Sequence, residues 1–311
     1  MSWTTLLQSR ADTDLQMYSP SEFDFNTRNT DKYVYLFIQD GKKKVITGNV
    51  PKDLQNIYIP RLRFIEYMLD KIDANQIGDA IIPLYIADSF AYESKRIEFS
   101  WAKPANKRGL LFPCWTFMDW ENVKQEFQTN YIPWTERETG PYFIGANSTK
   151  NSGFREIIRS FYPNNVVLTD STKEWRSRFE PSTNLMKYKF VFDLPGLKPW
   201  SVRSPQIALS GSHSIRFLQY YPKWEEEPWI QFYEDPDDIR SSSILLEGNY
   251  NTPIKKEIIQ PLQDAIENHI HTGLRKWARA KRIREHMMKL NEQDIVRYLE
   301  YIFRHVATRQ S

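Results

Sequence analysis

A serine and an arginine follow the end of a predicted strand and could bind a phosphate group. The strand covers residues 187–194, where polar residues alternate with large apolar ones before the run becomes continuously apolar. Ser201 and Arg203 come next, after a Pro-Gly turn. A guanidinium matches phosphate oxygens, and α/β sheets bind ligands at the carboxyl ends of their strands. Both side chains are therefore candidates for binding a phosphate group, although position alone favours a surface arginine in a loop.

A carboxylate lies at the end of a second apolar run. Residues 79–87 (DAIIPLYIA) are predicted to form a buried strand, and Asp88 follows directly. An ionised carboxylate can accept the proton of an attacking hydroxyl group, which is the work of a general base. From the spacing alone, a turn or cap residue is the commoner interpretation of Asp88.

Two further motifs have spacings that metal sites use, but each has a simpler explanation. Asp235 and Asp237 flank Pro236 after an apolar stretch, which predicts the capped start of a helix. His269 and His271 lack an acidic or cysteine residue placed to complete a metal site, so they are predicted to be solvated helix residues. We therefore expect no metal.

A basic stretch at 275–284 supports an alternative function. A non-catalytic protein could use this stretch as a helix that binds nucleic acid or an anionic surface. The net charge of +3 gives no overall case for nucleic-acid binding. Without an aromatic platform or a known binding motif, a solvated helix face is the commoner interpretation. The basic residues are Arg275, Lys276, Arg279, Lys281, Arg282 and Arg284.

The elements that would position these residues form an α/β pattern. A chain of 311 residues is long enough for two domains, and its 26% of charged residues is typical of a folded protein. Asp40-Gly41 predicts a hairpin between strands 32–39 and 42–47. The polar segment 136–141 is the predicted linker. We expect domains at 1–138 and 139–250, followed by C-terminal helices at 251–311 that pack back on the first domain.

The single cysteine, Cys114, excludes an intramolecular disulfide. It lies in an apolar and aromatic run, which predicts a buried and unreactive thiol. The first residues lack the basic and apolar regions of a secretory leader, and no apolar run approaches the roughly 18 residues that span a bilayer. We therefore expect a soluble protein without a membrane span, in a reducing compartment such as the cytoplasm.

Three stretches of the chain match one family in the right order. They are GLLFPCWTF at 109–117, YFIGANST at 142–149 and KYKFVFDLPGLKPWSVRSPQIALSGS at 187–212. Together they resemble glycosyltransferase family 90, which holds the fungal capsule-associated xylosyltransferases and the animal protein O-glucosyltransferases. The resemblance covers residues 80–240. The chain departs from the family at Ile144, where arginine is usual, and by one extra residue before Ser201.

The resemblance implies an inverting glycosyltransferase with two facing Rossmann-like domains, the GT-B type. Such an enzyme would move glucose or xylose from a UDP-sugar to a hydroxyl group of a glycan or glycoprotein acceptor, with no obligatory cofactor or metal. Compact, signal-less relatives occur in large DNA viruses that build their own capsid glycans. A viral capsid glycan, made in the host cytoplasm, is therefore an expected acceptor, and nucleic acid is not an expected partner.

The resemblance also implies roles for individual residues. Asp88 falls where family members place the catalytic base. The residues implied in acceptor binding are Trp115, Thr116 and Phe117, for which core packing is an equal alternative. The residues implied in donor binding are Gly145, Asn147, Ser148, Asp170, Trp200, Ser201 and Arg203.

Overall fold

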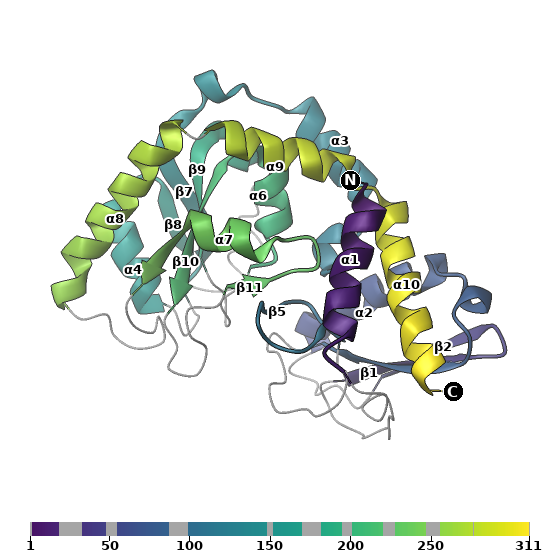
Figure 1. The fold of residues 1–311 in the computed structure, drawn as a ribbon. Helices are drawn as coiled ribbons and strands as arrows, with labels where there is room; N and C mark the ends of the chain where they lie inside the picture. The colour runs from purple at the N-terminus through teal and green to yellow at the C-terminus, as the bar shows by residue number, and fades with distance from the viewer. Residues whose placement is uncertain are drawn as a thin grey trace. The chain divides into compact units, whose positions relative to one another are not determined.

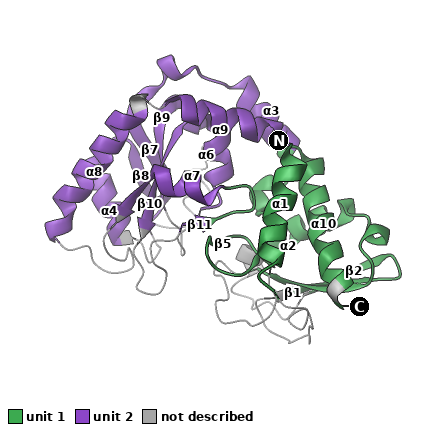
Figure 2. Cartoon of the chain, viewed as in Figure 1, with its two compact units in different colours: residues 1–120, 230–234, 290–311 green, residues 121–229, 235–289 purple. Residues whose placement is uncertain are grey.

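The computed structural model describes residues 2–18, 33–47, 55–86, 99–147, 152–169, 182–194, 201–219, 228–246, 256–275 and 277–310. Helices and strands are mixed along the chain, and parallel strands occur in both of its larger sheets, so the predicted α/β class is confirmed (Figure 1). The chain forms two compact units (Figure 2). Unit 1 comprises residues 1–120, 230–234 and 290–311, and unit 2 comprises residues 121–229 and 235–289.

Unit 1 is built on a mixed sheet. Its strands are β1 (Tyr33–Gln39), β2 (Lys42–Thr47), β3 (Ala80–Tyr85), β4 (Phe99–Ser100) and β6 (Leu110–Leu111), in the order β2-β1-β3-β4-β6. Asp40 and Gly41 join β1 to β2 with φ values of 50° and 69°, the left-handed conformation that a two-residue hairpin turn requires. The predicted hairpin is confirmed. It makes this sheet differ from the all-parallel sheet of a Rossmann-like domain.

The last helix of the chain completes the core of unit 1. The helices described in this unit are α1 (Trp3–Leu15), α2 (Gln55–Lys71) and α10 (Glu292–Gln310), and short elements lie at Ala74–Gln76, Lys103–Pro104 and Trp115–Phe117. Phe303 of α10 contacts the ring of Phe99 at 5.4 Å. The hydroxyl of Tyr298 donates a hydrogen bond to the carbonyl of Leu111 at 2.8 Å. Helix α10 therefore packs its buried face on the sheet.

Unit 2 is built on a sheet whose neighbouring strands are all parallel. Its strands are β7 (Glu138–Ala146), β8 (Val166–Thr169), β9 (Tyr188–Asp193), β10 (His213–Gln219) and β12 (Ser243–Leu246), in the order β12-β10-β9-β7-β8. When these five strands are numbered 1 to 5 along the chain and read from the β8 edge, their order is 2-1-3-4-5. This is the strand order of flavodoxin-like doubly wound sheets. The order reverses between β7 and β9, and in such sheets ligands bind at the carboxyl ends of the strands at that point.

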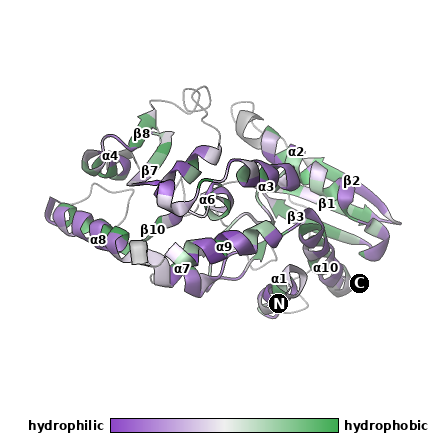
Figure 3. Ribbon diagram, turned by 90° about the horizontal axis from the view of Figure 1, so that it is seen from above, coloured by the Kyte–Doolittle hydropathy of each residue, from purple (hydrophilic) through white to green (hydrophobic). Residues whose placement is uncertain are grey.

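Helices cover both faces of this sheet. The helices described in unit 2 are α3 (Trp120–Thr129), α4 (Ser152–Phe161), α6 (Ser204–Ser210), α7 (Pro236–Ser242), α8 (Lys256–Arg275) and α9 (Trp277–Lys289). Successive strand residues face opposite sides. Tyr142 and Val191 pack with Ile207 of α6, whereas Phe143 and Phe190 pack in the cluster that contains residues of α4 and α8. Helix α9 is coloured largely as hydrophilic (Figure 3). Within the described residues, no helix is long and apolar enough to cross a bilayer.

The two units divide the chain differently from the predicted domains. Unit 2 begins at Glu121 rather than at residue 139, and the predicted linker 136–141 lies largely in β7. Glu138 pairs with Tyr188 of β9, and the register shifts before Pro141. Main-chain pairing in a sheet does not require apolar side chains, which explains why a polar segment with Gly and Pro is a strand here. Of the C-terminal helices, α10 belongs to unit 1, and α8 and α9 belong to unit 2.

Candidate functional site

Two arginines lie at the carboxyl end of β7, beside the ring of Phe143. The guanidinium carbons of Arg203 and Arg155 are 5.2 and 5.3 Å from the ring centroid. Arg203 donates a hydrogen bond to the carbonyl of Ile144, and Arg155 donates one to the carbonyl of Ala146. The two side chains therefore meet where the strand order of the sheet reverses, although they come from separate segments of the chain.

The segment after β9 places Arg203 at the start of α6. Arg203 is the N-cap residue of this helix, and Pro205 follows near its first turn. The main-chain N–H of Arg203 donates a hydrogen bond to Oγ of Ser201 at 3.2 Å. Pro205 predicts a short helix over residues 205–209, and the structure confirms one at Ser204–Ser210. Ser201 and Arg203, both predicted donor-binding residues, thus lie side by side.

Both arginines are partly removed from water and repel each other. Arg155 is only 6% exposed, and Arg203 is half-buried. Burial lowers the pKa of Arg203 to about 10, opposed by the charge of Asp193. Burial, together with the charge of Arg203, lowers the pKa of Arg155 to about 10. Both side chains remain protonated at neutral pH, so a bound anion would interact with two positive charges in surroundings less polar than water.

The ring of Phe143 packs directly against Gly145, where there is no space for a side chain. A Cβ atom at this position would lie 2.7 Å from Cζ of Phe143, closer than van der Waals contact allows. It would also lie 3.5 Å from Nη2 of Arg203. Glycine at this predicted donor-binding position is therefore explained by the packing beneath the arginines.

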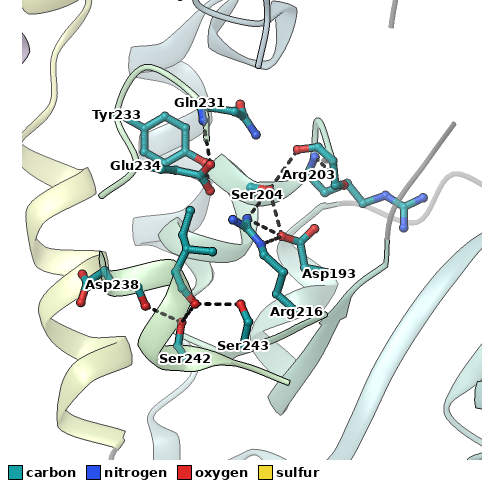
Figure 4. Close-up of polar contacts among 12 residues, drawn as sticks. Asp193, Arg203, Ser204, Arg216, Gln231, Tyr233, Glu234, Asp238, Ser242 and Ser243 are labelled. Atoms are coloured by element: carbon teal, nitrogen blue, oxygen red, sulfur yellow. Dashed lines mark hydrogen bonds and ion pairs between the residues drawn. The ribbon is translucent and has the colours of Figure 1, made fainter. Parts of the chain in front are cut away.

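A buried carboxylate ends β9. Asp193 is 5% exposed, and its Oδ2 accepts hydrogen bonds from Nε of Arg216 at 2.8 Å and from Oγ of Ser204 at 3.0 Å (Figure 4). Nη2 of Arg216 lies 2.5 Å from the same oxygen. Because Ser204 follows Arg203 directly, this network ties the segment that carries Arg203 to β9 and β10.

Asn147 lies just past the end of β7. Its main-chain N–H donates a hydrogen bond to the carbonyl of Thr169 at 2.7 Å, and its Nδ2 donates one to Glu156 at 2.6 Å. It therefore lies near the end of the strand that carries Gly145. The other residues predicted to bind the donor, Ser148, Asp170 and Trp200, lie outside the described residues.

The residues predicted to bind the acceptor lie in unit 1. Phe117 is fully buried and contacts the rings of Trp120 and Phe232 at 4.5 and 5.0 Å, which is core packing. Trp115 and Thr116 keep partial exposure and could touch a ligand. Asp88, the predicted base, lies outside the described residues.

An arginine that sequence reasoning missed lies beside Trp115. The guanidinium carbon of Arg61 is 4.6 Å from the Trp115 ring centroid, and Arg61 donates a hydrogen bond to the carbonyl of Ile86. It is 4% exposed. The buried guanidinium of Arg61 therefore lies at the carboxyl end of β3, at Ile86, which precedes Asp88 by two residues in the sequence.

Cys114 is buried, as predicted, and its thiol is hydrogen-bonded. Its Sγ lies 2.7 Å from Oγ1 of Thr116 and donates a hydrogen bond to Oε1 of Gln231 at 3.3 Å. Burial raises the pKa of this thiol to about 11. At pH 8 only about one thiol in a thousand is then ionised, and the thiolate is the reactive form.

We expect the folded protein to resist alkylation at Cys114. Iodoacetamide at pH 8 should leave the native chain unmodified, and it should add one carbamidomethyl group after unfolding in guanidinium chloride. Intact mass spectrometry before and after unfolding measures both states. Stoichiometric labelling of protein that keeps its native circular dichroism spectrum would contradict the assignment.

The acidic segment caps a helix, as predicted. Asp235 is the N-cap residue of α7, and its side chain accepts hydrogen bonds from the main-chain N–H groups of Asp237 and Asp238 at 2.9 and 3.2 Å. Asp237 also forms an ion pair with Arg240 at 2.7 Å. These contacts account for the Asp-Pro-Asp-Asp sequence without a metal.

His269 does not pair with His271. Its Nε2 lies 3.1 Å from Nε2 of His213, which begins β10. No group of three His, Cys, Asp or Glu side chains suited to a metal ion occurs in the part of the chain that the structure describes. His271 is exposed, as predicted for a solvated helix residue, whereas His269 is partly buried against His213, which the sequence pattern did not predict.

Two arginines of the basic stretch 275–284, Arg279 and Arg284, contact other residues of unit 2. Arg279 forms an ion pair with Asp238 at 3.2 Å. The guanidinium of Arg284 lies 4.2 Å from the ring centroid of Tyr131. Lys281 lies 3.8 Å from a carboxylate oxygen of Glu285, although both side chains are more than half exposed. The side chains of residues 275 and 276 lie outside the described residues. These contacts account for the charges of Arg279 and Arg284, whereas Lys281 and Arg282 are exposed.

Comparison of the chain with known protein families and curated proteins identified no relative. No protein-family model matches the chain. No curated protein sequence matches it at a significant level. The resemblance to glycosyltransferase family 90 therefore stays a prediction.

Proposed function

We propose that this protein is an inverting glycosyltransferase that moves glucose or xylose from a UDP-sugar to a hydroxyl group of a glycan or protein. The observation that carries the proposal is the pair of guanidinium groups, Arg155 and Arg203, at the carboxyl end of β7. Ligand sites of doubly wound sheets lie at this point of the fold. The motifs that resemble glycosyltransferase family 90 supply the reaction type.

A diphosphate fits the charge of this site. When the bond between the sugar and UDP breaks, negative charge grows on the leaving diphosphate, and preorganised positive groups stabilise that transition state. Each guanidinium can donate two hydrogen bonds to phosphate oxygens in one plane. Arg155 also offers a substitute for the arginine that the family usually has at position 144, where this chain has Ile144.

The reaction follows as a single displacement. In the proposed GT-B arrangement, Asp88 of unit 1 accepts the proton of the acceptor hydroxyl as its oxygen attacks the anomeric carbon. The bond from that carbon to the diphosphate breaks on the opposite face, and UDP leaves toward the arginines of unit 2. The configuration of the sugar carbon is therefore inverted. The acceptor that the resemblance favours is a capsid glycan of a large DNA virus.

Ligand-dependent heat stability tests the proposal. UDP and the correct UDP-sugar should raise the melting temperature, because a ligand that binds only the folded chain adds about 2.7 kcal/mol of stability at a hundredfold excess over Kd. The panel contains UDP, UDP-glucose, UDP-xylose and UDP-galactose, with adenosine diphosphate as a matched control for the base. A melting temperature unchanged by all four uridine ligands would refute the proposal, and steeply salt-dependent nucleic-acid binding would favour the alternative function instead.

We also expect turnover to survive metal removal. Arg155 and Arg203 supply the positive charge that a metal provides in other transferases, and Asp235 and Asp237 are engaged at the start of α7. Treatment with excess chelator, followed by dialysis, should leave the rate of UDP release within about twofold of the untreated enzyme. An absolute requirement for Mn²⁺ or Mg²⁺, restored by titration, would contradict this expectation.

A further inference from the structure

A buried carboxylate oxygen of Asp193 lies in the same region as Arg155 and Arg203. Oδ1 of Asp193 is buried and has no hydrogen-bond partner among the described residues, although Oδ2 of the same carboxylate accepts hydrogen bonds from Arg216 and Ser204. In Figure 4, Oδ2 is the oxygen that the dashed lines reach, while the other oxygen lies on the side toward Arg203. A buried acceptor without a donor is costly and rare in folded proteins. A bound ligand would explain it.

A matching atom lies at the end of the neighbouring strand. Oδ1 of Asn147 is also buried without a hydrogen-bond partner in the described part of the chain. The contact between Nδ2 and Glu156 fixes the orientation of this amide, because a carboxylate needs a donor. The carboxyl ends of β7 and β9 thus present two acceptors, Asn147 Oδ1 and Asp193 Oδ1, close to two guanidinium groups. Acceptors of this kind complement hydroxyl groups, whereas guanidinium groups complement phosphate.

We propose that Asp193 accepts a hydrogen bond from a sugar hydroxyl of the ligand whose diphosphate lies on Arg155 and Arg203, so that the site selects diphosphates that carry a sugar. This inference rests on the proposed function and adds a specificity residue to it. The hydroxyl could belong to the ribose or to the transferred sugar, since both are attached to the diphosphate. The charge of Asp193 acts on Arg203, which places the two groups within electrostatic reach of each other. Oδ2 holds the carboxylate in place, and Oδ1 faces the ligand.

Asp193→Asn separates these two roles. Arg216 and Ser204 donate to Oδ2, so the amide oxygen of asparagine should take that position. The amide NH₂ then occupies the position of Oδ1, where it donates instead of accepting. The variant therefore keeps the shape of the network while reversing the polarity of the one atom under test. It also removes a negative charge near Arg203, which favours anions in general.

Calorimetric titration with three probes gives the test. We expect Asp193→Asn to bind inorganic pyrophosphate as tightly as the wild-type protein or more tightly. We expect the same variant to bind a sugar-bearing diphosphate about tenfold or more weakly, because a hydrogen bond to a charged acceptor is lost. If UDP already shows the loss, the hydroxyl is that of the ribose. If only UDP-glucose or UDP-xylose shows it, the hydroxyl is that of the transferred sugar.

Ser204→Ala is the matched control. It removes one donor to Oδ2 and leaves Oδ1 unchanged, so its ratio of UDP-sugar to pyrophosphate affinity should equal that of the wild type. Equal losses for all three probes in Asp193→Asn, or no loss for any, would overturn the inference and leave the proposed function standing. A wild-type protein that binds neither UDP nor the UDP-sugars would overturn the proposed function, and this inference with it.

Discussion

Arg203→Ala should lower kcat/KM for the UDP-sugar by about 30- to 1,000-fold, which corresponds to about 2–4 kcal/mol of transition-state stabilisation. The guanidinium is half-buried beside Arg155, and it has a specific position between Phe143 and the carbonyl of Ile144. Its charge therefore acts on a bound diphosphate with little screening by water. Initial rates of UDP release at varied donor concentration measure the effect.

Two companion variants make the result interpretable. Arg203→Lys keeps the charge but loses the planar pair of donors, so we expect an intermediate loss. Arg240→Ala removes an exposed arginine of the same unit, whose ion pair with Asp237 is on the surface, and should leave kcat/KM unchanged. If Arg203→Ala melts at the wild-type temperature and keeps wild-type kcat/KM, the diphosphate assignment is wrong.

Asp88→Asn should lower the transfer rate by about 10²- to 10⁴-fold, the usual contribution of a general base. Asparagine has the shape of aspartate but cannot accept the proton of the attacking hydroxyl. A carboxyl group of ordinary pKa is already ionised at neutral pH, so the base needs no special surroundings. Rates of glycosyl transfer at saturating donor measure the loss.

Binding of UDP distinguishes loss of the base from loss of the donor site. Asp88→Asn should still gain heat stability from UDP, whereas Arg203→Ala should gain much less. The anomeric configuration of the product, read by NMR, is a second check, because a single displacement inverts the α configuration of the donor. Near wild-type transfer by Asp88→Asn, or a product with the α configuration, would remove Asp88 from the mechanism.

Local pattern was sufficient to predict β9, α6 and the capped start of α7. The alternating and then continuous apolar run at 187–194 became β9, and the proline near residue 205 marked the start of α6. Asp235 capped α7 as its residue type predicted. These elements could be predicted because their signals lie within a few residues of one another.

The parts of the site that depend on tertiary contacts could not be predicted in the same way. Arg155 follows Gly145 by ten residues and lies on a helix, where one more arginine carries no local signal. Arg155 became a candidate because the fold places it near the charge of Arg203, which is far from it in the sequence. The sequence pattern could have identified Asp193, because it ends an apolar run in the same way as Asp88 does. The partners that bury it, Arg216 and Ser204, come from later in the chain.

The start of β7 is a strand that the side-chain pattern wrongly predicted as a linker. Polar residues with glycine and proline predicted a linker at 136–141, yet Glu138 pairs with Tyr188 in the sheet. Strand β9 supplies the main-chain partners, and a segment can join a parallel sheet through those bonds whatever its side chains are. A pattern of side chains cannot report bonds that the main chain forms with a distant strand.

The position of UDP in a crystal of the complex tests the donor site most directly. We expect the diphosphate oxygens within hydrogen-bond distance of both Arg155 and Arg203, at the carboxyl end of β7. UDP bound at any other place on the chain, or crystals grown in excess UDP in which these two guanidinium groups contact no phosphate, would contradict the assignment of this site.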